Sequence, residues 1–185
     1  MKTALLVIDV QESFRHRPYW QDGEAATFIA RTQDLIDRCR DARIPVVQVF
    51  HVEPGDASHP FSMASGHVRT MRELSIRPDA VFHKSVHSAM FGKDEQGRTL
   101  EAWLREKGIE RVLVTGIRTE QCCETTTRHA SDLGFDVRYV MDATLTFPMR
   151  ATSGREYSAA EIRERTELVL TDRFAKVVSA NSALA

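Results

Sequence analysis

The chain alternates between short apolar runs and longer segments that have one apolar face. Six runs rich in valine and isoleucine predict strands at residues 3–8, 44–50, 80–83, 111–116, 136–141 and 175–179. Because the runs are apolar at nearly every position rather than at every second one, we expect strands covered on both faces, as in a parallel sheet.

Four intervening segments carry apolar residues at helical spacing, and we expect helices within 23–44, 98–108, 119–134 and 158–174. In the second of these, Leu100, Trp103 and Leu104 share one face, and a glycine ends the pattern. The regular succession of strand and helix predicts an α/β fold, with helices on both faces of an open, mostly parallel sheet.

Residues 51–79 fit neither pattern, because this long stretch is rich in proline, glycine, serine and histidine. A long excursion inside a compact chain is typical of a binding loop or a lid.

Composition narrows the range of partners. With 185 residues, of which 42% are hydrophobic, the chain has the size of a single domain, and we expect residues 1–185 to form it. A formal net charge of -1 with both signs mixed gives no basic surface for nucleic acid or an anionic membrane, so a small molecule is the expected ligand.

The N-terminal apolar run ends at Asp9, too early for a signal peptide or a membrane span, so a cytoplasmic location is expected. Cys39, Cys122 and Cys123 form neither a disulfide framework nor a metal-binding pair, and we expect reduced thiols.

Polar residues follow four of the predicted strands. They are Asp9, His51, Lys84 and the turn from Gly116 to Cys123. Because ligands bind beyond the carboxyl ends of parallel strands, we expect a carboxylate, an ammonium and a thiol to meet at one rim of the sheet.

Such a set suits nucleophilic acyl transfer through a thioester. The start of a helix and the Lys84 ammonium would lower the pKa of a thiol there, and Asp9 would accept its proton. Free N–H groups at the helix start would receive the oxyanion. Taken singly, each residue also fits an ordinary role as a packed thiol, a loop carboxylate or a solvated ammonium. Helix position alone does not separate Cys122 from Cys123.

Three segments together resemble the isochorismatase-like cysteine hydrolase superfamily, which includes nicotinamidases, carbamoylsarcosine amidohydrolases and ureidoacrylate amidohydrolases. The segments are LLVIDVQESF, HKSVHSAMFG and VTGIRTEQCCETTTRHASDLGFDVRYVMDAT. The likeness covers nearly the whole chain, and G-x-x-T-x-x-C-x-x-x-T from Gly116 to Thr126 is its most specific part. It implies a catalytic triad of Asp9, Lys84 and Cys122, with Cys123 as a packing residue.

With this resemblance we predict a single three-layer α/β/α domain whose six-stranded, mainly parallel sheet has the order 3-2-1-4-5-6. The resemblance also implies a cis peptide bond between Ile117 and Arg118 and an oxyanion hole made by the N–H groups of Arg118 and Cys122. The Arg118 side chain, where family members often have alanine, would reach toward the pocket and select an acidic or polar substrate, or it would lie in solvent.

Gln11 and Phe14 match the Q-x-x-F that follows the catalytic aspartate in the family. The candidate substrate-binding residues are Gln11, Phe14, Trp20, His51, Phe61, His87 and Phe91.

A metal is not expected. Nicotinamidases that resemble this chain usually bind a divalent metal through D-x-H and a later histidine, and His51, Asp56, His59 and His67 lie in the corresponding region. The position two residues before His51 is Val49, so the motif is missing and nicotinamidase activity is disfavoured. No other cofactor is implied.

The function predicted from the sequence is therefore hydrolysis of a C–N bond in a small amide, imide or carbamoyl compound. One alternative is isochorismatase-type hydrolysis of a vinyl ether, which needs Asp9 but no thiol. Another is a binding or redox-sensing protein without catalytic activity. Relatives form dimers, tetramers or larger rings, so a homo-oligomer, either a dimer or a tetramer, is expected.

Overall fold

The computed structural model describes all 185 residues, and its main sheet has six strands in the order β3-β2-β1-β4-β5-β8. Their bounds are β1 Thr3–Ile8, β2 Val46–His51, β3 Ala80–Lys84, β4 Arg111–Ile117, β5 Asp136–Leu145 and β8 Lys176–Val178. Every neighbouring pair is parallel. Since β8 is the sixth strand of this sheet along the chain, the predicted order is confirmed.

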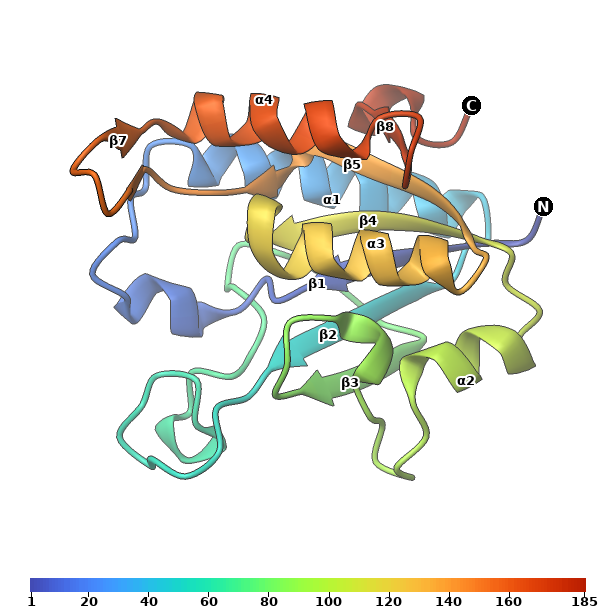
Figure 1. Ribbon diagram of the computed structural model, residues 1–185. Helices are drawn as coiled ribbons and strands as arrows, with labels where there is room; N and C mark the ends of the chain where they lie inside the picture. The colour runs from blue at the N-terminus through green and yellow to red at the C-terminus, as the bar shows by residue number, and fades with distance from the viewer.

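Helices cover both faces of the sheet, so the predicted α/β fold is confirmed (Figure 1). The helix α1 (Ala25–Asp41) lies on one face, and α2 (Leu100–Glu106), α3 (Glu124–Asp132) and α4 (Ala159–Leu170) lie on the other. Successive side chains of β1 divide between these layers, because Leu6 and Ile8 pack in the core with α2 and α3 whereas Leu5 and Val7 pack in the core with α1. This is why the strand is apolar at every position.

Local sequence determines where the helices begin and end. The side chain of Thr99 accepts a hydrogen bond from the N–H of Ala102 at the start of α2, and Ser158 with Glu161 forms a capping box on α4. The helix α1 stops at Asp41, because Arg43 has a left-handed φ of 57° and Pro45 follows.

Three features differ from the sequence-based prediction. The strand β5 continues to Leu145, beyond the expected end at 141. Two-residue strands, β6 (Met149–Arg150) and β7 (Glu156–Tyr157), form an antiparallel pair that is too short to give a sequence pattern. The segment 119–134 begins with one π-helical turn, Thr119–Cys123, and becomes α-helical only from Glu124.

The long segment after β2 is held by its own buried side chains rather than by regular structure. Apart from a short 3-10 turn at Met63–Ser65 it contains no helix or strand, yet Phe61, Met71 and Leu74 are buried. It therefore closes one side of the region beyond the strand ends. No helix of the chain combines the length and the apolar character that crossing a bilayer requires.

Candidate active site

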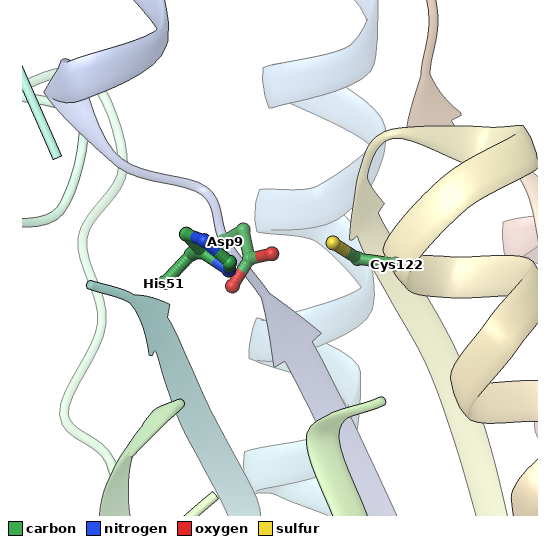
Figure 2. A group of neighbouring side chains, drawn as sticks. All are labelled: Asp9, His51 and Cys122. Carbon is green, nitrogen blue, oxygen red and sulfur yellow. The ribbon is translucent and has the colours of Figure 1, made fainter. Parts of the chain in front are cut away.

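The carboxyl ends of three neighbouring strands place the candidate residues side by side. Asp9 directly follows β1, and His51 and Lys84 are the last residues of β2 and β3, paired with each other in the register of those strands. Figure 2 shows the Asp9 carboxylate between the His51 ring and the sulfur of Cys122, which lies at the start of the helical segment after β4. Parallel topology thus brings together residues that are far apart in sequence.

The Lys84 ammonium lies at the centre of this group. Its Nζ is 2.7 Å from Asp9 Oδ2, 3.1 Å from His51 Nδ1 and 3.4 Å from Cys122 Sγ. The side chains of Lys84 and Asp9 are fully buried, whereas Asp9 Oδ1 has no hydrogen-bond partner. That oxygen is consequently available to receive a proton within a buried site.

The contact with Lys84 also fixes the form of His51. A lysine ammonium is only a donor, so His51 Nδ1 must accept and Nε2 must carry the hydrogen of the neutral ring. Burial, followed by the charge of Lys84, lowers the pKa of His51. The ring therefore stays neutral and directs its Nε2–H toward Glu53, whose carboxylate lies 3.6 Å away.

Hydrogen bonds with residues of β5 fix the turn that carries Cys122 to the sheet. The hydroxyl of Tyr139, a buried residue of β5, donates to the carbonyl of Thr119 at 2.7 Å, and Thr119 Oγ1 donates to Thr144 Oγ1 at 2.9 Å. In this turn Cys122 lines the cavity and is 7% exposed, whereas Cys123 is fully buried in the core beneath α3. The structure therefore distinguishes two thiols that helix position alone did not.

The loop before the thiol has the backbone form that the resemblance implies. The peptide bond between Ile117 and Arg118 is cis, and the Arg118 N–H donates to no backbone carbonyl. Gly116, with φ of 130°, lies so close to β1 that an added Cβ would come within 1.9 Å of the Ile8 carbonyl oxygen. Only glycine fits at this point between the thiol loop and the strand that carries Asp9.

Electrostatics favour a neutral thiol in the free site, contrary to the expectation of a lowered pKa. Burial, followed by the negative charge of Asp9, raises the pKa of Cys122 to about 12, although Lys84 acts in the opposite direction. Burial acts to lower the pKa of Lys84, but the charge of Asp9, helped by the hydrogen bonds to Asp9 and Cys122, opposes it, and that pKa is raised. The sequence-based expectation is wrong because it counted the helix start and Lys84 but not the burial of the thiol, which is the largest cause of the shift.

A cavity of about 300 Å³ opens over the thiol. Six of the catalytic and substrate-binding candidates line it: Asp9, Phe14, His51, Phe61, His87 and Cys122. His87, although exposed, brings its Nδ1 to 3.9 Å from Cys122 Sγ, and Phe14 packs edge-on against Phe61 with ring centroids 4.9 Å apart.

Lys84 is buried and is not part of the cavity wall, and four further candidate side chains also lie outside it. Gln11 is buried behind it and hydrogen-bonds the main chain of His51. Trp20 packs against Phe147, and Phe91, 58% exposed, packs against His129. The Arg118 side chain is buried, forms an ion pair with Glu120 at 3.0 Å and lies over the ring of Tyr19, so it neither enters the cavity nor extends into solvent.

Five lining residues were not among the catalytic or substrate-binding candidates, although His59 was considered as a metal ligand: Arg17, Tyr19, Glu53, His59 and Gln121. The first two lie in the irregular stretch around the 3-10 turn Glu12–His16, and Glu53 and His59 lie in the long segment after β2. No periodicity indicates which way such side chains point. The only available signal is that an excursion near a strand end often supplies binding residues.

The residues at the positions of the nicotinamidase metal ligands do not form a metal site here. Val49 is a fully buried core residue, the ring of His67 stacks on that of His16, and His59 Nε2 lies 3.2 Å from the Arg17 guanidinium. A carboxylate oxygen of Asp9, a ring nitrogen of His51 and Cys122 Sγ do lie within 4.8 Å of one another. The Lys84 ammonium, however, is within hydrogen-bonding distance of all three residues and already supplies the positive charge there.

The sheet order and the cavity beyond the carboxyl ends of its strands are those of an open, parallel α/β fold. The family model of the isochorismatase domain matches residues 3–182. The chain belongs to the isochorismatase family of hydrolases.

Two related sequences and one solved structure show how similar this chain is to known members of the family. The isochorismatase-family protein YrdC of Bacillus subtilis (strain 168) is 27% identical over 99% of this chain and 95% of its own length. Nicotinamidase 3 of Arabidopsis thaliana is 31% identical over 78% of this chain and 73% of its own. A solved isochorismatase-family structure from Burkholderia xenovorans LB400 superimposes with a TM-score of 0.84, is 31% identical, and covers 97% of this chain and 84% of that one.

Proposed function

We propose that the protein hydrolyses a C–N bond in a small amide, imide or carbamoyl compound, with Cys122 as the nucleophile. The observation that carries the proposal is the single ammonium of Lys84 within 3.4 Å of both the Cys122 thiol and the Asp9 carboxylate. The named activity of the Arabidopsis relative, a nicotinamidase, is consistent with an amide substrate.

The proposed reaction begins from the neutral thiol, since the pKa of Cys122 is raised to about 12. As the sulfur attacks the carbonyl carbon, its proton passes to Asp9, whose Oδ1 has no other partner. The Lys84 ammonium stabilises the negative charge that develops on the sulfur during the attack. The N–H groups of Arg118 and Cys122 receive the oxyanion.

Asp9 then returns the proton to the departing nitrogen, which leaves as ammonia or an amine and generates a thioester. A water molecule that loses its proton to Asp9 attacks the thioester. Asp9 passes this proton to the departing sulfur, so the products are a carboxylic or carbamic acid and the free thiol. Each step moves one proton through Asp9, so the carboxylate is needed twice in a cycle.

The experiment is a screen of small amides and ureido acids with ammonia release as the readout, on the wild type and three variants. Cys122→Ala and Asp9→Ala are expected to abolish turnover, and Cys123→Ala to retain most of it, because that thiol lies in the core. Hydrolysis of a vinyl ether that survives Cys122→Ala but not Asp9→Ala would support the isochorismatase-type alternative instead. Absence of any hydrolysis, with a thiol that no substrate acylates, would favour a binding or redox protein.

The expected homo-oligomer remains a prediction. Light scattering on the purified chain should give the mass of a dimer or a tetramer, and a monomer across the working concentration range would contradict it.

A further inference from the structure

The cavity contains a guanidinium that no carboxylate of the chain neutralises. Arg15 and Arg17 lie in and just after the same 3-10 turn, but Arg15 forms ion pairs with Glu12, Asp22 and Glu73. Arg17 is half-buried, lines the cavity and takes part in none of the ion pairs of the protein. An unpaired cation in a partly dry cavity favours an anionic ligand.

The neighbour of Arg17 adds a second donor. His59 Nε2 lies 3.2 Å from the Arg17 guanidinium, and its Nδ1 lies 3.3 Å from the N–H of Phe61. A neutral imidazole has only one nitrogen that can accept, so one of these two contacts cannot be a hydrogen bond. In the free site the guanidinium can only donate, so Nε2 accepts from Arg17; an oxyanion that takes over this Arg17 hydrogen bond would let Nδ1 accept from Phe61 and leave His59 Nε2–H as a second donor to the same oxygen.

The other charges of the cavity leave this corner positive. The carboxylate of Asp9 is neutralised by Lys84 at 2.7 Å. The remaining acidic residue of the wall, Glu53, lies 3.6 Å from His51 Nε2 and forms no ion pair with Arg17. A ligand carboxylate at Arg17 therefore replaces a partner that the protein itself does not supply.

An aromatic wall separates the positive corner from the reacting group. The ring of Phe61 packs near both histidines, with centroid distances of 5.7 Å to His51 and 5.8 Å to His59. His51 contacts Lys84, and His59 contacts Arg17. Since Arg17, Phe61 and Cys122 line the same cavity, a compact ligand packed on Phe61 can contact both the nucleophile and the guanidinium.

We infer that the substrate is a small amide or carbamoyl compound that also bears a carboxylate, bound by Arg17 and His59. The inference rests on the proposed function for the identity of the reacting group, but the anion site itself stands on the geometry of Arg17 and His59. It assigns acid selection to Arg17 and not to Arg118, whose guanidinium is already paired with Glu120.

Ammonia release should be compared for malonamate, succinamate and glutaramate, each against its methyl ester. The wild type is expected to favour at least one acid over its ester by tenfold or more in kcat/KM, mainly through KM. In Arg17→Gln the preference should fall close to one. Arg15→Gln is the matched control, because it changes an arginine of the same region that is paired outside the cavity.

A binding measurement that needs no turnover separates this inference from the proposed reaction. Malonate, succinate and glutarate, compared with sodium chloride at equal ionic strength, should raise the melting temperature of the wild type and of Cys122→Ala, but not of Arg17→Gln. If the dicarboxylates stabilise through Arg17 while no amide is cleaved, the anion site stands and the proposed reaction fails. If amides are cleaved but the methyl esters react as well as the acids, or no dicarboxylate stabilises through Arg17, the inference is overturned.

Discussion

Gln11 binds the main chain of His51 on both of its polar groups. Its Oε1 accepts from the His51 N–H at 2.8 Å, and its Nε2 donates to the His51 carbonyl at 3.0 Å. This pair joins the segment after β1 to the last residue of β2, and His51 in turn contacts Lys84. A side chain outside the cavity wall therefore aligns two of the strands that carry the site.

Replacing Gln11 by methionine should consequently impair activity through position rather than chemistry. We expect a loss of about 1–2 kcal/mol in stability and a tenfold or greater fall in kcat/KM. Gln33 makes the same bidentate contact with the main chain of Ser75 far from the site, so Gln33→Met is the control. Equal activity losses in the two variants would contradict a positioning role.

The raised pKa of Cys122 predicts an unusual alkylation profile. With a pKa of about 12, the thiolate fraction should grow about tenfold for each pH unit between 7 and 10, so the rate with iodoacetamide should rise without a plateau near pH 8.5. Asp9→Asn removes a charge that raises this pKa, so the pKa should fall and alkylation at pH 8 should become faster than in the wild type. Cys122→Ala should abolish the reaction, since Cys39 and Cys123 are fully buried. A plateau below pH 9 in the wild type would refute the raised value.

Gly116 should tolerate no side chain. In Gly116→Ala the new Cβ would meet the Ile8 carbonyl oxygen at 1.9 Å, so β4 or β1 must shift, at a cost of about 3 kcal/mol. Gly154 also has a positive φ but open space around it, and Gly154→Ala should cost only about 1 kcal/mol. Chemical denaturation measures both, and similar losses would show that the close approach to Ile8 is unimportant.

The Arg118 and Glu120 pair should matter for stability and not for substrate charge. Both side chains are about nine-tenths buried, so removing one partner leaves an uncompensated charge and should cost about 3 kcal/mol. The double change Arg118→Met with Glu120→Gln should recover part of that loss. In Arg118→Met the ratio of kcat/KM for acidic and neutral amides should match the wild type, and a shift in that ratio would place the side chain in the substrate site.

A chelator should leave turnover unchanged. Lys84 already provides a positive charge beside Asp9, His51 and Cys122, and Val49 stands where a metal ligand is needed. Activity before and after dialysis against EDTA, with zinc or iron added back, measures this. Restoration by either metal would overturn the metal-free prediction.

Much of the fold followed from the sequence because its cause is local. A strand such as β1 is apolar throughout because both faces are covered, and that pattern is visible in the residues themselves. The pair β6 and β7 is two residues long on each side and leaves no periodic trace. Strand ends likewise predicted Asp9 and Lys84 as neighbours, because parallel topology alone brings them to one edge.

The walls of the cavity could not be predicted in the same way. Arg17 and His59 come from irregular segments, where the direction of a side chain depends on tertiary contacts. Trp20 and Phe91 were chosen as aromatic residues near the rim, but one packs on Phe147 and the other on His129. The thiol pKa was misjudged for a related reason, since the degree of burial at Cys122 depends on the whole surrounding fold.

The strand order has a further consequence for synthesis on the ribosome. The strand β1 is made first, yet its end pairs Ile8 with Gly116, and Gly116 pairs in turn with Thr144. A nascent chain that stops before Thr144 lacks the strand against which the Cys122 turn is held. The turn that carries Cys122 therefore gains its hydrogen bonds with Tyr139 and Thr144 only after β5 has been synthesised, late in translation.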